Sequence, residues 1–140
     1  MEIVAGLITA AAIVGLGYAT RQGRSLSFYS SVLIVIALVY VLFAVMNGSL
    51  RTIVIEGAIA AVFIAVAVAG TRSSTLCAAA LLMAGGLALH GVYDLVHSAV
   101  VSNPVVPTWW PVFCGVVDIV LGGWVIILLN RDTLRIQSVA

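Results

Sequence analysis

LSFYSSVLIVIALVYVLFAVM, residues 26–46, contains no charged side chain. An apolar α-helix of about 20 residues is long enough to cross the hydrocarbon core of a bilayer, which is about 30 Å thick. A helix also satisfies all its backbone hydrogen bonds within the segment, as lipid requires. This stretch therefore predicts a transmembrane helix.

Four further apolar segments of similar length surround this one, and short polar sequences separate them. They run from about 3 to 20, 52 to 70, 76 to 99 and 111 to 129. The connection before the last segment holds Pro104 and Pro107, which resist helix formation. We therefore predict an all-α protein, a polytopic transmembrane helical bundle with five spans, in a single domain over residues 1–140.

The composition points to the same class of protein. Of 140 residues, 64% are hydrophobic and only 8% are charged, and the mean hydropathy is +1.27. A soluble domain has about 25% charged residues, so the main partner of this surface is the lipid bilayer. A net charge of +1 offers no basic patch for nucleic acid. Cys77 and Cys114 are expected on opposite sides of the membrane, which argues against a disulfide between them.

The arginines predict the orientation, because cytoplasmic loops collect positive charge. With five spans, Arg51 lies alone on one side of the membrane. The other side holds Arg21, Arg24, Arg72, Arg131 and Arg135. The first segment is preceded by Glu2 and not by positive charge, unlike a signal peptide. We expect a multi-pass protein of the cell membrane, inner or plasma, with its N-terminus outside and its C-terminus in the cytoplasm.

Five ionisable side chains fall inside the predicted spans, where each costs a few kcal/mol and usually has a function. They are Glu56, His90, Asp94, His97 and Asp118. A rise of about 1.5 Å per residue places all five in the outer half of the membrane. This shared depth is the strongest functional signal of the sequence.

The spacing within residues 76–99 places three of these groups on one helical face. His90, Asp94 and His97 are separated by four and three residues, so they fall within about 60° of one another. Gly86 precedes them on the same stripe and would allow another helix to approach closely. Cys114 and Gly122 lie one turn on either side of Asp118, and Ala60 follows Glu56. Small residues thus surround each ionisable group.

Two imidazoles and three carboxylates make a ligand set for a divalent metal ion, with zinc or iron as the best candidates. Helices of a bundle can supply such ligands from facing sides. We therefore predict a metal site formed by Glu56, His90, Asp94, His97 and Asp118. An enzyme with this site would use the metal to activate water for hydrolysis, or to oxidise a membrane-soluble substrate.

Other functions fit the same residues. The polar groups could join the helices by hydrogen bonds in a non-catalytic accessory or assembly subunit of a membrane complex, or in a homo-oligomer. Buried acids and histidines also form proton or cation pathways in transporters. His90 or His97 could bind haem axially, but two histidines on one helical face cannot hold one haem from both sides.

The last two segments carry a further pattern. HGVYDLVH, residues 90–97, is followed by PTWWPVFC, residues 107–114, and by Asp118. This resembles a family of small uncharacterised bacterial and fungal integral membrane proteins, in which a His-x-x-x-Asp-x-x-His helix precedes a proline–aromatic loop. The resemblance implies membrane helices in this region and carries no activity with it.

Overall fold

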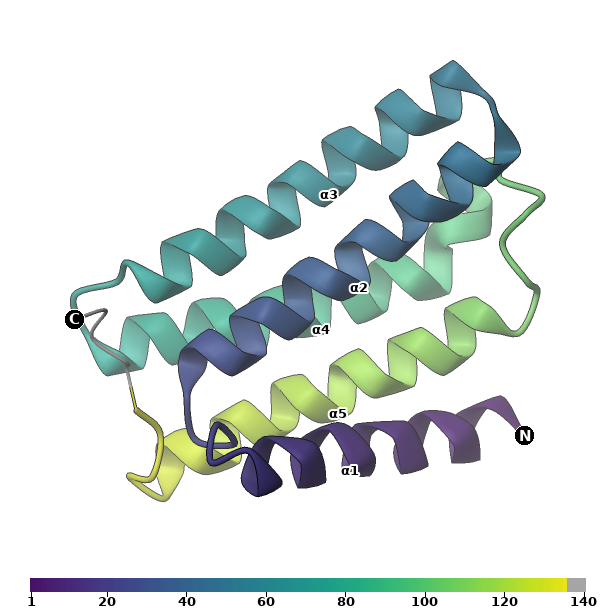
Figure 1. Ribbon diagram of the computed structural model, residues 1–140. Coiled ribbons are helices and arrows are strands. Elements are labelled where there is room, and N and C mark those ends of the chain that lie inside the picture. Colours follow the sequence, from purple (N-terminus) through teal and green to yellow (C-terminus); the bar gives the residue numbers. More distant parts are fainter. Residues whose placement is uncertain (136–140) are drawn as a thin grey trace.

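The computed structural model describes residues 1–135, and within them it contains five long α-helices (Figure 1). The helices are α1 (Glu2–Ala19), α2 (Leu26–Asn47), α3 (Leu50–Thr71), α4 (Leu76–Val100) and α5 (Trp110–Asn130). Each is long and apolar enough to cross a membrane. The predicted all-α architecture with five spans is confirmed.

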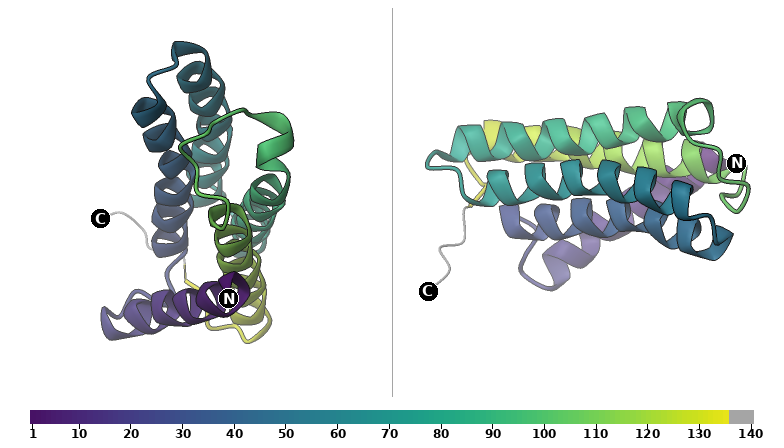
Figure 2. Two further views of the ribbon diagram at one scale, coloured as in Figure 1. Left: turned by 90° about the vertical axis from the view of Figure 1, so that its right-hand side faces the viewer. Right: turned by 90° about the horizontal axis from the view of Figure 1, so that it is seen from above.

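The helices form a bundle in which α4 lies at the centre of the contacts. α4 packs against α5, α3 and α2, and α2 also packs along α3. α1 contacts α5 and lies at the edge of the bundle, crossing it at an angle (Figure 2). The central helix is therefore the one that carries the His90–Asp94–His97 stripe.

The side chains are distributed as expected for a protein surrounded by lipid. Large aliphatic residues point outward, among them Val54, Val62 and Leu89, each more than half exposed. Alanines such as Ala67 and Ala79 are completely buried between the helices. Small buried residues let helix backbones approach, which favours packing in a membrane, where lipid is as apolar as leucine.

Local sequence signals explain where the helices stop and start. Gly48 ends α2 in the left-handed conformation, with φ of 71°, and the Ser49 side chain accepts a hydrogen bond from the Thr52 backbone N–H. This cap starts α3 two residues before the predicted segment. Thr75 caps α4 in the same way, through the backbone N–H of Ala78. Pro111 lies in the first turn of α5, where a proline needs no N–H partner.

The bundle has two chemically different ends. The N-terminus, the α2–α3 turn and the α4–α5 loop lie at one end, here called the N-terminal end (Figure 1). Arg51 is the one arginine there. The opposite end, here called the C-terminal end, carries the other five arginines. This distribution fits the predicted orientation, which stays a prediction.

Candidate metal site

The backbones of α4 and α5 touch at the level of the ionisable residues. A Cβ atom added to Gly91 would lie 2.9 Å from the carbonyl oxygen of Gly115, and one added to Gly115 would lie 3.0 Å from that of Gly91. One added to Gly122 would lie 2.9 Å from the carbonyl oxygen of Ala84. Glycine at these positions therefore lets the polar faces of α4 and α5 meet.

His90, Asp94 and Asp118 form a compact group at this contact. The distance from His90 Nδ1 to Asp118 Oδ2 is 2.7 Å, and that to Asp94 Oδ2 is 3.6 Å. One ligand atom from each of the three residues lies within 4.8 Å of the other two. The three side chains are at most 1% exposed. This group could hold a metal ion.

The carboxylates of this group are not satisfied by the protein. Both oxygens of Asp94 and Oδ1 of Asp118 are buried and have no hydrogen-bond partner among the described residues. A buried polar atom without a partner costs about 1–3 kcal/mol, and more when it is charged. Such oxygens need a cation, a proton or a bound water.

Two further polar side chains face Asp94. The Tyr40 hydroxyl interacts electrostatically with the Asp94 carboxylate, and so does the Cys114 thiol. Both groups lie near enough to influence Asp94, but by distance and angle neither Asp94 oxygen accepts a hydrogen bond from a described residue. Phe63 packs edge-on against the His90 ring, with 4.7 Å between ring centroids. The group is thus closed off by aromatic rings and a thiol.

A second polar cluster lies between α3 and α4. His97 Nε2 lies 2.7 Å from Glu56 Oε1, and the Tyr93 hydroxyl donates a 2.7 Å hydrogen bond to Glu56 Oε2. Glu56 is 1% exposed and His97 is 2% exposed. Both carboxylate oxygens of Glu56 are therefore satisfied, in contrast to those of Asp94. This cluster is a complete hydrogen-bonded link between two helices.

Tyr40 connects the two groups. Its ring stacks on that of His97, with centroids 4.2 Å apart and planes 19° apart, and it also contacts the rings of Tyr93 and His90. The space beside the histidines is therefore filled by aromatic side chains. A haem would have to displace them, so the packing argues against the haem alternative.

One of the five ionisable residues lines a pocket at the N-terminal end. His97 lines a pocket of about 470 Å³ below the α4–α5 loop, together with Ser98 and Asn103. Toward the C-terminal end the core is mostly apolar and contains Met83 and Leu121, both completely buried, beside the buried hydroxyl of Ser30. Within the described residues, no acidic or histidine side chain is buried in that half.

The structure divides the five residues predicted as one ligand set. All five are buried and lie in the half of the bundle nearer the N-terminal end. His90, Asp94 and Asp118 come together, whereas Glu56 and His97 pair with each other. Tyr40 lies between the two groups, and no spacing in the sequence predicts this position.

Comparisons with protein-family models, with curated proteins and with solved structures find no match for this chain. The fold and the site together define a five-span helical membrane protein with a buried His90/Asp94/Asp118 group that could hold a metal. Its function is therefore inferred from the chemistry of that group.

Proposed function

We propose that the protein binds a divalent metal ion through His90, Asp94 and Asp118. The observation that carries this proposal is the pair of completely buried carboxylates with three oxygens that lack hydrogen-bond partners among the described residues. Two carboxylates and a neutral imidazole offset the charge of one divalent cation. A net charge of zero matters here, because buried charge is expensive within a bilayer.

One distance within the group already suits such an ion, and a second would have to lengthen. In a four-coordinate site with bonds of about 2.0–2.1 Å, neighbouring ligand atoms lie about 3.3 Å apart. The 3.6 Å between His90 Nδ1 and Asp94 Oδ2 is close to this value. The 2.7 Å between His90 Nδ1 and Asp118 Oδ2 is a hydrogen-bond distance. A metal ion would take the place of the shared proton, and this pair would separate by about 0.6 Å.

The ligand types favour zinc or iron. Imidazole nitrogen and carboxylate oxygen together suit both metals. Iron sites with two histidines and one carboxylate would need a second imidazole, and His97 is already bound to Glu56. A Cys114 thiolate would add a negative charge that the metal does not balance, so the thiol stays protonated. Zinc is therefore the first candidate and iron the second.

A site with three protein ligands leaves a coordination position for water or substrate, as catalytic zinc sites do. This supports a metal-dependent enzyme that acts on a membrane-soluble substrate. The pocket next to His97 lies on the side of the group that faces the N-terminal end, and a substrate would have to displace the aromatic rings between that pocket and the group.

The other functions have different support. The satisfied cluster of Glu56, His97 and Tyr93 favours helix-joining by hydrogen bonds, which fits an accessory subunit. A proton or cation pathway has less support, because the described core toward the C-terminal end lacks buried acids and histidines.

Elemental analysis of the detergent-purified protein tests the proposal, with two histidine variants of the same helix. We expect one metal ion per chain in the wild type and in His97→Ala, and none in His90→Ala. Circular dichroism checks that both variants stay helical. Absence of metal in the wild type, even after reconstitution with zinc, iron, manganese or copper, would refute the proposal.

Two further measurements address the alternatives. An accessory subunit would co-purify with a partner in mild detergent and contain no metal. A proton pathway would give a pH-dependent flux in liposomes that disappears in Asp94→Asn. A metal-loaded wild type without flux supports the metal proposal over both.

A further inference from the structure

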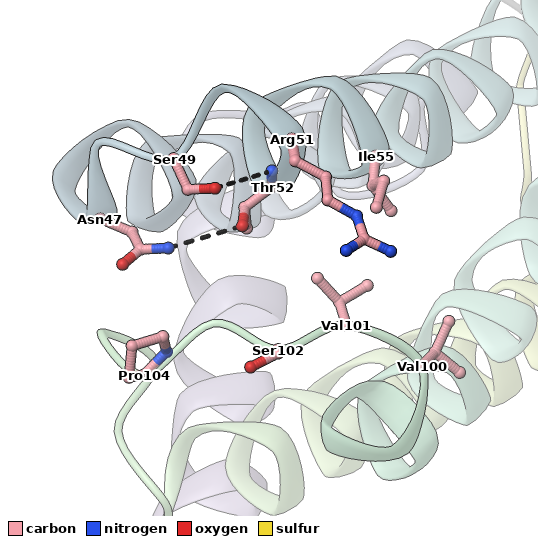
Figure 3. Close-up of a pocket in the computed structure, with 9 residues that line it drawn as sticks. All are labelled: Asn47, Ser49, Arg51, Thr52, Ile55, Val100, Val101, Ser102 and Pro104. Atoms are coloured by element: carbon pink, nitrogen blue, oxygen red, sulfur yellow. Dashed lines mark hydrogen bonds between the residues drawn. The ribbon is translucent and has the colours of Figure 1, made fainter.

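A second pocket, of about 430 Å³, opens at the N-terminal end between the start of α3 and the beginning of the α4–α5 loop (Figure 3). The pocket shares no residue with the candidate metal site formed by His90, Asp94 and Asp118. The residues lining it are Asn47, Ser49, Arg51, Thr52, Ile55, Val100, Val101, Ser102 and Pro104.

The polar side of this pocket carries a single positive charge. Arg51 is exposed and forms no salt bridge with any described residue, and no acidic side chain lines the pocket. Ser102 and Ser49 contribute hydroxyl groups, and Asn47 contributes an amide. A guanidinium with hydroxyl neighbours binds phosphate oxygens well, because its planar N–H groups can engage two oxygens at once.

The other side of the pocket continues into an apolar surface. Val100 lines the pocket and belongs to a stripe on α4 with Val96, Val92 and Leu89, which are 45% to 64% exposed. These residues recur at helical spacing and so lie on one face. The stripe runs along the exposed face of α4, from the pocket at the N-terminal end to about half the length of the helix. An acyl chain of a lipid would lie in the same direction.

We propose that this pocket binds the phosphate headgroup of an anionic phospholipid, with Arg51 as its charge partner and the acyl chains against the α4 stripe. Free phosphate would use the guanidinium but not the aliphatic stripe. A zwitterionic headgroup would bring a cation close to Arg51. The polar pocket and the apolar stripe together therefore favour an anionic lipid. The inference does not depend on the metal site, because the two share no residue.

Native mass spectrometry of the detergent-solubilised protein tests this, with dioleoyl phosphatidylglycerol as the probe. We expect the wild type to retain one lipid about fivefold more tightly than Arg51→Gln, the effect of one arginine near an anionic membrane surface. Arg72→Gln, at the other end of α3, is the matched control and should bind like the wild type. Arg51→Lys should keep part of the affinity.

Any of the following results would overturn the proposal. The first is equal binding by the wild type and Arg51→Gln, with circular dichroism showing both folded. The second is the same loss in Arg72→Gln, which would mean a general effect of charge. The third is displacement of the lipid by millimolar inorganic phosphate, or equal binding of dioleoyl phosphatidylcholine. Either would remove the assignment to an anionic phospholipid.

Discussion

Asp94 is the residue whose burial is hardest to explain by packing. It is completely buried at the centre of the bundle, and neither of its oxygens has a hydrogen-bond partner within the described chain. Its neighbour Asp118 at least pairs with His90. A carboxylate kept at such a place costs stability, and ligand binding is the usual compensation at functional sites.

Replacing the Asp94 carboxylate should change the stability of the protein and its binding of zinc in opposite directions. We expect Asp94→Asn to stabilise the metal-free protein by about 1–3 kcal/mol, because an amide costs less to bury than a carboxylate that accepts no hydrogen bond. The same variant should lose the stabilisation that zinc gives the wild type. Thermal unfolding in detergent, with and without zinc, measures both effects. A less stable metal-free variant would mean that Asp94 has a structural function.

Replacing Tyr93 should lower the stability of the protein without affecting metal binding. Tyr93→Phe removes one hydrogen bond to the buried Glu56 carboxylate. We expect it to lower the free energy of unfolding by about 1–2 kcal/mol and to leave metal content unchanged. Denaturant titration and elemental analysis check this pair of results. Metal loss in Tyr93→Phe would contradict the division into two clusters.

At the scale of residues, the sequence predicts which ionisable side chains are buried. It does not predict which of them contact one another. The spacing of His90, Asp94 and His97 indicates one polar stripe, and their burial confirms that it faces the bundle. The partner of each histidine depends on the order and rotation of the helices. The lipid-facing and helix-facing surfaces are both apolar, so hydropathy does not indicate which helices are neighbours. It therefore could not predict that His97 pairs with Glu56 of α3 and His90 with Asp118 of α5.

The contact between α4 and α5 brings His90, Asp94 and Asp118 together. Gly91 of α4 and Gly115 of α5 face each other and allow the two backbones to touch beside Asp94 and Asp118. The sequence indicated close packing at Gly86 and Gly122, and both have atoms of other helices within 3.0 Å of an added Cβ. The five segments were predicted within about two residues of the observed helices, because apolar length and caps are local signals.

Gly91→Ala tests the importance of this contact. The new Cβ would lie 2.9 Å from a backbone oxygen of α5, which cannot rotate away. We expect a loss of about 1–3 kcal/mol in unfolding free energy and at least about tenfold weaker metal binding, since ligands on α4 and α5 move apart. Calorimetric metal titration measures the second effect.

Gly85→Ala is the matched control on the same helix, because nothing lies within 4 Å of its added Cβ. It should bind metal like the wild type. An equal effect of the two substitutions would show that helix flexibility, and not the α4–α5 contact, controls the site.

The buried acids and histidines of the described residues all lie in one half of the bundle. The ionisable groups and the two pockets at the α4–α5 loop lie toward the N-terminal end, and five of the six arginines lie at the C-terminal end. With the predicted orientation, the His90/Asp94/Asp118 group lies nearer the outside of the cell than the cytoplasm. The side of the membrane from which a ligand would approach it therefore depends on the direction in which the chain inserts.

The chain contains a natural probe of that direction. Cys77 is exposed in the first turn of α4 at the C-terminal end, whereas Cys114 is buried. A membrane-impermeant maleimide should therefore label Cys77 in inverted membrane vesicles but not in intact cells. The five arginines at that end favour its location in the cytoplasm. Cys77→Ser combined with Ser102→Cys moves the thiol to the α4–α5 loop and should reverse the result. Labelling of wild-type Cys77 from outside would mean that the bundle inserts the other way, and that the metal group faces the cytoplasm.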